Sequence, residues 1–194
     1  DPSSGAVTAD ATHAIPADSL IFVSGNVTSI KGTLSSRVSV ASMMKINITE
    51  SLTYVDADGR PAYHLTQNGT PIPATSLPPN AVWGENGIDY VKNPDFVPGN
   101  NPPTLGLMAV DDIVLSADAP QNLEVHGSLF SLNETWHADV DGPNAHAQGN
   151  LRIVGSIASR KAGYRAAPPL GYGLSGGYLY DSGLLSKPPP FYLK

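Results

Sequence analysis

The clearest pattern along the chain is a short alternation of hydrophobic and polar residues that ends close to a glycine. It occurs at Leu123–Leu129 (LEVHGSL) and returns at Leu151–Ile157 (LRIVGSI). A period of two residues predicts a strand with one buried face. The glycine indicates a bend, a bulge or the close approach of another backbone. The two segments are therefore predicted to be equivalent strands of a repeated unit.

Looser copies of the same pattern occur earlier in the chain. Val27–Leu34 has Gly32 at the glycine position, and Ile46–Leu52 keeps the alternation with Glu50 there. Repeated strands with a bend at a fixed place predict a single all-β β-solenoid, in which each coil covers the previous one. A β-sandwich or barrel is the alternative, because its strands also alternate. Further strands are expected at residues 20–23, 38–41, 107–109 and 113–115.

Changes in periodicity and in Pro and Gly content divide the chain into four parts. Residues 1–18 lack periodicity and are expected to form an extended arm, and residues 19–165 are expected to form the solenoid. A Pro/Gly-rich insertion interrupts the solenoid at about residues 55–104, where Asn68-Gly69 favours a hairpin turn. Residues 166–194 form a tail rich in Pro, Gly and Tyr, which is expected to be extended and to lie along the solenoid or reach a neighbour.

Composition narrows the function classes. The 194 residues carry a formal charge of −6, which argues against nucleic acid or an anionic membrane as the main partner. The absence of cysteine excludes disulfides and thiolate chemistry. No apolar run approaches the roughly 20 residues that span a bilayer. Four N-x-[ST] triplets favour an extracellular location and are possible glycosylation sites: Asn26, Asn47, Asn68 and Asn133.

One candidate catalytic set consists of Asp111, Asp112 and His126. Paired aspartates and a histidine beside Gly127 resemble the arrangement in pectin-degrading β-helix hydrolases, and inverting hydrolysis needs two carboxyl groups around a water. The alternative is that the aspartates form a turn and that His126 lies on the exposed face of its strand. We favour this alternative, and no catalytic residue is predicted.

Metal binding has weak sequence support. Asp56-x-Asp58-Gly59 and Asp139-x-Asp141-Gly142 resemble the opening of a calcium loop, but neither has the acidic ligand that completes one. Plain turns are the expected structures, because Asp and Gly favour turns. The five histidines have no close metal-binding spacing: His13, His64, His126, His137 and His146. No metal or other cofactor is predicted.

A basic cluster is the candidate site for an anionic ligand. Its members are Arg152, Arg160, Lys161, Tyr164 and Arg165. The cations could follow an anionic strand while a base stacks on the tyrosine. The more common alternative is a solvated edge without a ligand.

The ordered set of segments is similar to a known family. The segments are 20–25 (LIFVSG), 30–34 (IKGTL), 37–41 (RVSVA), 46–48 (INI), 52–54 (LTY), 105–109 (LGLMA), 123–132, 149–157, Tyr180-Asp181 and 188–190 (PPP). Together they resemble the bacterial minor-pilin-associated β-solenoid domain, as in ComZ-like proteins of type IV pili in Deinococcus–Thermus bacteria. The resemblance covers residues 20–194.

This resemblance implies a β-solenoid displayed on a pilus or cell surface, with a role in pilus assembly, adhesion or DNA uptake. It implies no catalytic residues. We therefore expect an extracellular, non-catalytic structural module whose partners are other protein subunits or further copies of itself. Residues 1–18 or 166–194 are expected to contact another subunit. A carbohydrate-active enzyme and a DNA- or glycan-binding module are the alternatives.

Overall fold

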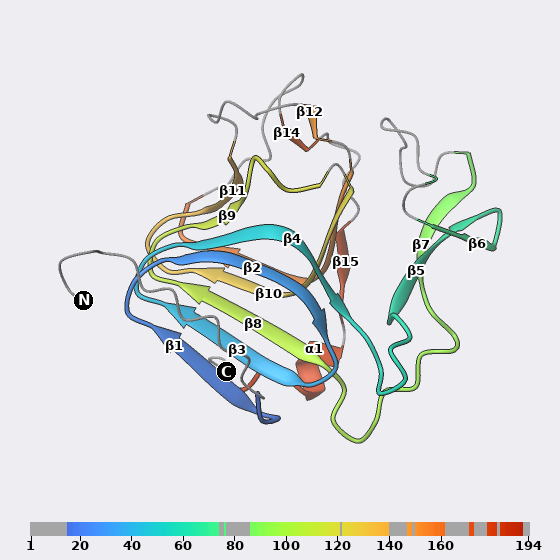
Figure 1. Ribbon diagram of the computed structural model, residues 1–194, viewed down its shortest axis with the longest axis horizontal. Coiled ribbons are helices and arrows are strands. Elements are labelled where there is room, and N and C mark those ends of the chain that lie inside the picture. Colours follow the sequence, from blue (N-terminus) through green and yellow to red (C-terminus); the bar gives the residue numbers. More distant parts are fainter. Residues whose placement is uncertain are drawn as a thin grey trace, which may run out of the picture.

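The computed structural model confirms an all-β protein (Figure 1). It describes residues 15–73, 76, 86–120, 122–139, 147–148, 150–161, 171–172, 178–181 and 183–191. Within these residues α1 (Gly183–Ser186) is the one helix, and it is a single turn. No helix in the described part of the chain is long and apolar enough to cross a membrane.

Ten strands form one large sheet, in which every strand pairing is parallel. The strands are β1 (Ser19–Val23), β2 (Val27–Leu34), β3 (Arg37–Ser42), β4 (Ile46–Tyr54), β8 (Thr104–Ala109), β9 (Ile113–Leu115), β10 (Asn122–Ser131), β11 (Trp136–Ala138), β13 (Asn150–Ser159) and β15 (Tyr178–Tyr180).

The parallel pairs stack in three columns. The first column contains β1, β3, β8 and the ends of β10 and β13. The second contains the starts of β2 and β4, followed by β9 and β11. The third contains the ends of β2 and β4, the start of β10, β13 and β15. Because β10 belongs to the third column at its start and the first at its end, it bends between them.

Glycines mark this bend, as the pattern predicts. β10 and β13 pair residue for residue from Leu123 with Leu151 to Leu129 with Ile157, so Gly127 and Gly155 lie side by side. A Cβ added at Gly155 would lie 1.9 Å from the carbonyl oxygen of Gly127, which no L side chain tolerates.

The predicted glycine position is wrong for Gly32. Gly32 pairs with Leu52, and Leu52 pairs with Val125. Gly32 therefore lies two places before Gly127 in the third column. Register shifts in β2 lie on both sides of Ile30. Such shifts cannot be seen in a fixed-period alignment. The predicted position of Glu50 is wrong as well, because Leu52, two residues after it, already lies two places before Gly127.

Hydrophobic residues that alternate along the strands fill the space between the columns. Fully buried members include Ile46, Ile48, Leu107, Ile113, Leu115, Leu123, Val125 and Leu129. Burying each such side chain contributes about 1.5–3 kcal/mol. At the beginning of the chain Ile21, Val27, Ile30 and Leu34 are only partly buried, so the core is less well covered there.

The insertion forms a separate small sheet beside the large one (Figure 1). Its antiparallel strands are β5 (Tyr63–Gln67), β6 (Thr70–Ile72) and β7 (Ile88–Lys92). Asn68 and Gly69 connect β5 to β6 with positive φ angles of 51° and 79°, as the predicted type I′ hairpin requires. A second pair, β12 (Ala147–Gln148) with β14 (Gly171–Tyr172), is parallel.

The described end of the tail folds back onto the first column instead of extending away. Arg37 Nη2 donates to the carbonyl of Pro188 at 2.8 Å, and the Ser39 hydroxyl donates to the carbonyl of Pro190. Ser39 is fully buried beneath this segment. At these residues the tail lies along the solenoid, which is one of the two arrangements expected from the sequence, and its contact with another subunit stays a prediction.

Candidate functional site

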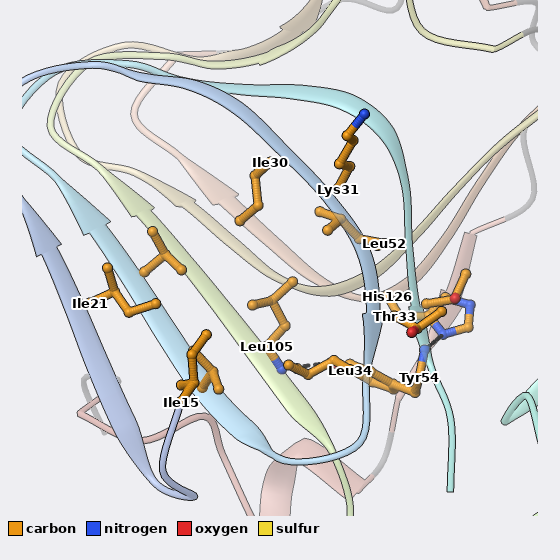
Figure 2. A pocket seen from close by; sticks show the side chains of 14 residues that line it. Ile15, Ile21, Ile30, Lys31, Thr33, Leu34, Leu52, Tyr54, Leu105 and His126 are labelled. Carbon is orange, nitrogen blue, oxygen red and sulfur yellow. Dashed lines mark hydrogen bonds between the residues drawn. The ribbon is translucent and has the colours of Figure 1, made fainter. Parts of the chain in front are cut away.

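The uncovered end of the core contains the larger of two described cavities, with a volume of about 220 Å³. Figure 2 shows Ile21, Ile30 and Leu105 pointing into it, with Tyr54 and His126 at one side. The complete lining is Ile15, Ile21, Ile30, Lys31, Gly32, Thr33, Leu34, Val38, Val40, Leu52, Thr53, Tyr54, Leu105 and His126. The cavity is mainly apolar and lies at the edge formed by β1 and β2.

The cavity follows from a missing side chain. In the third column Gly32 lies in register with Leu52, Val125 and Ile153, all of which are core residues. An added Cβ at Gly32 would have no atom within 4 Å. β2, the first strand of this column, therefore has no side chain at the interior position that Leu52, Val125 and Ile153 fill in the next three strands.

The edge itself is also uncovered. In the described part of the chain β1 pairs with β3 alone, and β2 pairs with β4 alone. Leu20 and Phe22 of β1 are exposed beside it. A long apolar strand edge is a surface to which another strand can add. This combination of open backbone groups and apolar side chains makes the β1–β2 edge the candidate interaction site.

A buried polar network lies behind the cavity and joins the two sheets. The backbone N–H of Tyr54 donates to His126 Nδ1 at 3.0 Å, so neutral His126 carries its proton on Nε2. Nε2 then donates to the Tyr90 hydroxyl at 2.7 Å, and this hydroxyl donates to Glu124 Oε2 at 3.0 Å. Arg152 Nη2 donates to Glu124 Oε1 at 2.7 Å.

Burial sets the protonation states of the network. Burial, together with the positive charge of Arg152, lowers the pKa of His126 to about 3. Burial also raises the pKa of Tyr90 well above its usual value, and the Glu124 carboxylate adds to this effect. His126 is consequently neutral at physiological pH and has no free ring nitrogen. The geometry suits a structural contact between sheets and does not suit a general base.

The prediction that His126 is exposed is wrong. Its side chain is 1% exposed, because Tyr63 and Tyr90 of the insertion sheet cover it with ring-centroid distances of 5.4 and 6.2 Å. The candidate catalytic set is not brought together in the described contacts. Asp112 instead forms an ion pair with Lys45 at 3.1 Å, and lies 3.9 Å from His137 Nδ1.

The predicted basic cluster is divided by the structure. Arg152 is 1% exposed and paired with Glu124, so its inclusion in a surface cluster is wrong. Arg160 and Lys161 are exposed beyond the end of β13, and Lys161 forms an ion pair with Glu134. Tyr164 and Arg165 lie outside the described residues.

Asp56 and Asp58 form a turn of the expected kind. The Asp56 carboxylate accepts backbone N–H groups of Asp58, Arg60 and Val97, and the Arg60 side chain. Burial raises the pKa of Asp56, but these hydrogen bonds outweigh it and lower the pKa to about 2. Its oxygens are therefore already occupied by donors.

The remaining candidates divide as follows. Among the described residues no group of three or more acidic or histidine side chains is placed to hold a metal ion. Asp139 is described, whereas Asp141, Gly142, His13 and His146 lie outside the described residues. The four sequon asparagines are all at least partly exposed: Asn26, Asn47, Asn68 and Asn133.

No protein-family model, curated protein or solved structure matches the chain. The site is therefore interpreted from its own geometry.

Sequence reasoning missed both the cavity and the network. The cavity depends on the register shifts in β2, and the sequence shows only one extra residue before Ile30 as a sign of them. The network had a partial signal, because Leu65, Ile88 and Tyr90 of the insertion pack with Val154 in a second core cluster. Their alternation in the sequence implies an apolar face that needs a partner surface, and the outer face of β10 and β13 provides it.

Proposed function

We propose that this chain is a non-catalytic β-solenoid module of an extracellular assembly, such as a pilus, filament or cell envelope, and that it joins the assembly through its β1–β2 edge. The observation that carries the proposal is this edge, where β1 and β2 each have one side without a described partner strand and border an apolar cavity of about 220 Å³. Strand addition satisfies the edge backbone and covers the cavity in one step.

The solenoid interpretation is supported by parallel pairs that are close in sequence. Ser19 pairs with Val38, and Asn122 pairs with Asn150. Parallel neighbours ordinarily need a crossover, which is usually a helix, and the described connections contain none. Successive coils of a solenoid provide such neighbours without helices. The alternative β-sandwich is built from antiparallel sheets, which fits these pairings poorly.

The assembly role is further supported by the resemblance to ComZ-like pilus domains. The enzyme alternative has less support, because Asp112 and His126 have separate partners. A DNA-binding role has little support, because Arg160 and Lys161 are the only exposed members of the basic cluster among the described residues. Loss of affinity in a salt titration of filter binding would identify that alternative, because it reports phosphate contacts.

The test compares two exposed hydrophobic residues in cells that produce the protein. Phe22→Lys places a charge on the β1 edge, and Val97→Lys is the matched control, since the two side chains are 61% and 60% exposed. We expect antibody labelling of the surface of intact cells for the unmodified protein and for Val97→Lys. Phe22→Lys is expected to be secreted without incorporation into the surface assembly. Labelling only after permeabilisation would reject the proposal.

A further inference from the structure

The two ends of the third column are complementary. Its pairings run from Gly32 to Leu52, from Leu52 to Val125, from Val125 to Ile153, and from Ile153 to Tyr178. All five residues occupy one position of the column in successive strands. At the first strand this position is empty, and at the last it carries the largest side chain of the series.

The empty position at Gly32 is part of the cavity described above. Ile30, Leu34 and Leu52 line the same cavity (Figure 2). Because Gly32 has a φ of +115°, an L side chain is unfavourable at this residue. The backbone therefore keeps the hole from being filled by the residue that lines it.

The opposite end presents the matching side chain. Tyr178 is 46% exposed, although Val125 and Ile153 at the equivalent position are fully buried. Its hydroxyl donates to the carbonyl of Gly155 in its own copy at 3.0 Å, and the ring exchanges this hydrogen bond when it enters the hole of a neighbour. Leu179 and Tyr180 are also exposed, so β15 is an apolar edge strand. In the described part of the chain it pairs with β13 alone.

The direction of the strands allows these ends to meet. Every pairing in the large sheet is parallel, so a second copy shifted along the stacking direction keeps the same strand direction. β15 of one copy can then pair with β2 of the next, and Tyr178 takes the position beyond Gly32. The hole of one copy is then filled by the tyrosine of its neighbour.

We propose that the occupant of the β1–β2 edge is a second copy of this chain, stacked head to tail through parallel pairing of β15 with β2. This deepens the proposed function by naming the partner at the same edge. Head-to-tail contacts use two different surfaces, so they leave one of each free and generate open filaments.

Disulfide trapping tests the register directly, because the chain has no cysteine of its own. Thr33 and Leu179 follow Gly32 and Tyr178, so they face each other in the proposed pairing. Neighbouring strands lie about 4.7–4.9 Å apart, within the range that a disulfide bridges. Oxidation of the double variant Thr33→Cys, Leu179→Cys should produce a ladder of oligomers. Each single variant can form dimers at most.

Two controls separate the proposed contact from chance collisions. Thr33→Cys with Leu185→Cys moves the second thiol to an exposed residue of α1, and it should give no ladder. In sedimentation without cysteines, Tyr178→Ala should weaken association at least about tenfold, as expected for a buried aromatic anchor. Leu185→Ala should leave association unchanged.

The outcomes also separate this inference from the proposed function. A protein that stays monomeric and forms no ladder, yet labels the surface of intact cells, overturns stacking and leaves the assembly role in place. A ladder equal in both double-cysteine variants also overturns it. Ladder formation in a protein found only inside cells rejects the extracellular role and retains the stacking contact.

Discussion

The close approach of Gly155 and Gly127 leads to a quantitative prediction for Gly155→Ala. The new Cβ would lie 1.9 Å from the Gly127 carbonyl oxygen, whereas ordinary contact begins at 3.4 Å. β10 and β13 would have to separate locally by about 1.5 Å, which exceeds what a hydrogen bond tolerates. The residue also has a φ of +149°, which L side chains rarely adopt.

The expected cost combines these effects. Losing about two ladder hydrogen bonds costs about 0.5–1.5 kcal/mol each, and the backbone strain adds about 1–3 kcal/mol. We expect the free energy of unfolding to fall by about 3 kcal/mol. For a chain of this size that corresponds to a decrease in Tm of about 6–12 °C.

Thermal unfolding followed by circular dichroism measures this decrease. Gly99→Ala is the matched control, because an added Cβ there has no atom within 4 Å. Gly127→Ala is expected to lie between them, since its Cβ would be 3.1 Å from the Leu105 carbonyl oxygen. If Gly155→Ala unfolds at the same temperature as Gly99→Ala, the strands are not stacked at this register.

Three further predictions concern the buried network. Tyr90→Phe removes the hydroxyl shared by His126 and Glu124 and should lower stability in urea unfolding by about 1–3 kcal/mol; an unchanged midpoint would contradict the network. Glu124→Leu should cost about 3–5 kcal/mol by leaving Arg152 buried without a counter-ion, and adding Arg152→Met should recover part of this loss. If the double variant is no more stable than Glu124→Leu, the ion pair is not the cause. His126 has a folded pKa of about 3 and an ordinary value of 6.5, so unfolding binds a proton between these values. Stability should therefore fall by about 1.4 kcal/mol per pH unit as pH decreases below 6.5, and His126→Gln should show a shallower fall between pH 6.5 and 5.

The sequence was sufficient to predict that the protein is all-β and that β10 and β13 are equivalent, neighbouring strands. Leu123–Leu129 and Leu151–Ile157 share a pattern without an intervening shift, so equal positions pair. The Asn68-Gly69 turn was equally predictable, because its backbone requirement is local. The register of Gly32 was not predictable, because it depends on shifts in the pairing of β2 with β4 that the pattern of residue types does not determine.

The buried network shows a different limit. Alternation identifies which face of a strand is hydrophobic, but not what covers the polar face. Glu124 and His126 follow the pattern of exposed positions, yet His126 is buried and Glu124 is half-buried, because a sheet from another part of the chain lies over them. Arg152 was assigned to a surface cluster for the same reason. The insertion sheet covers these residues, and the repeated strand pattern carries no information about where the insertion packs.

Coverage by the protein's own segments also determines where a partner can bind. The outer face of the third column carries the insertion sheet, which contacts it through Tyr90 and the network. On the first column, Ser39 is buried beneath the segment that ends at Pro190. Both sites are filled by intramolecular contacts, whereas β2 and β15 present edges with exposed or partly buried apolar residues. Among the described residues, the ends of the stack are therefore apolar surfaces that association could bury without displacing these segments.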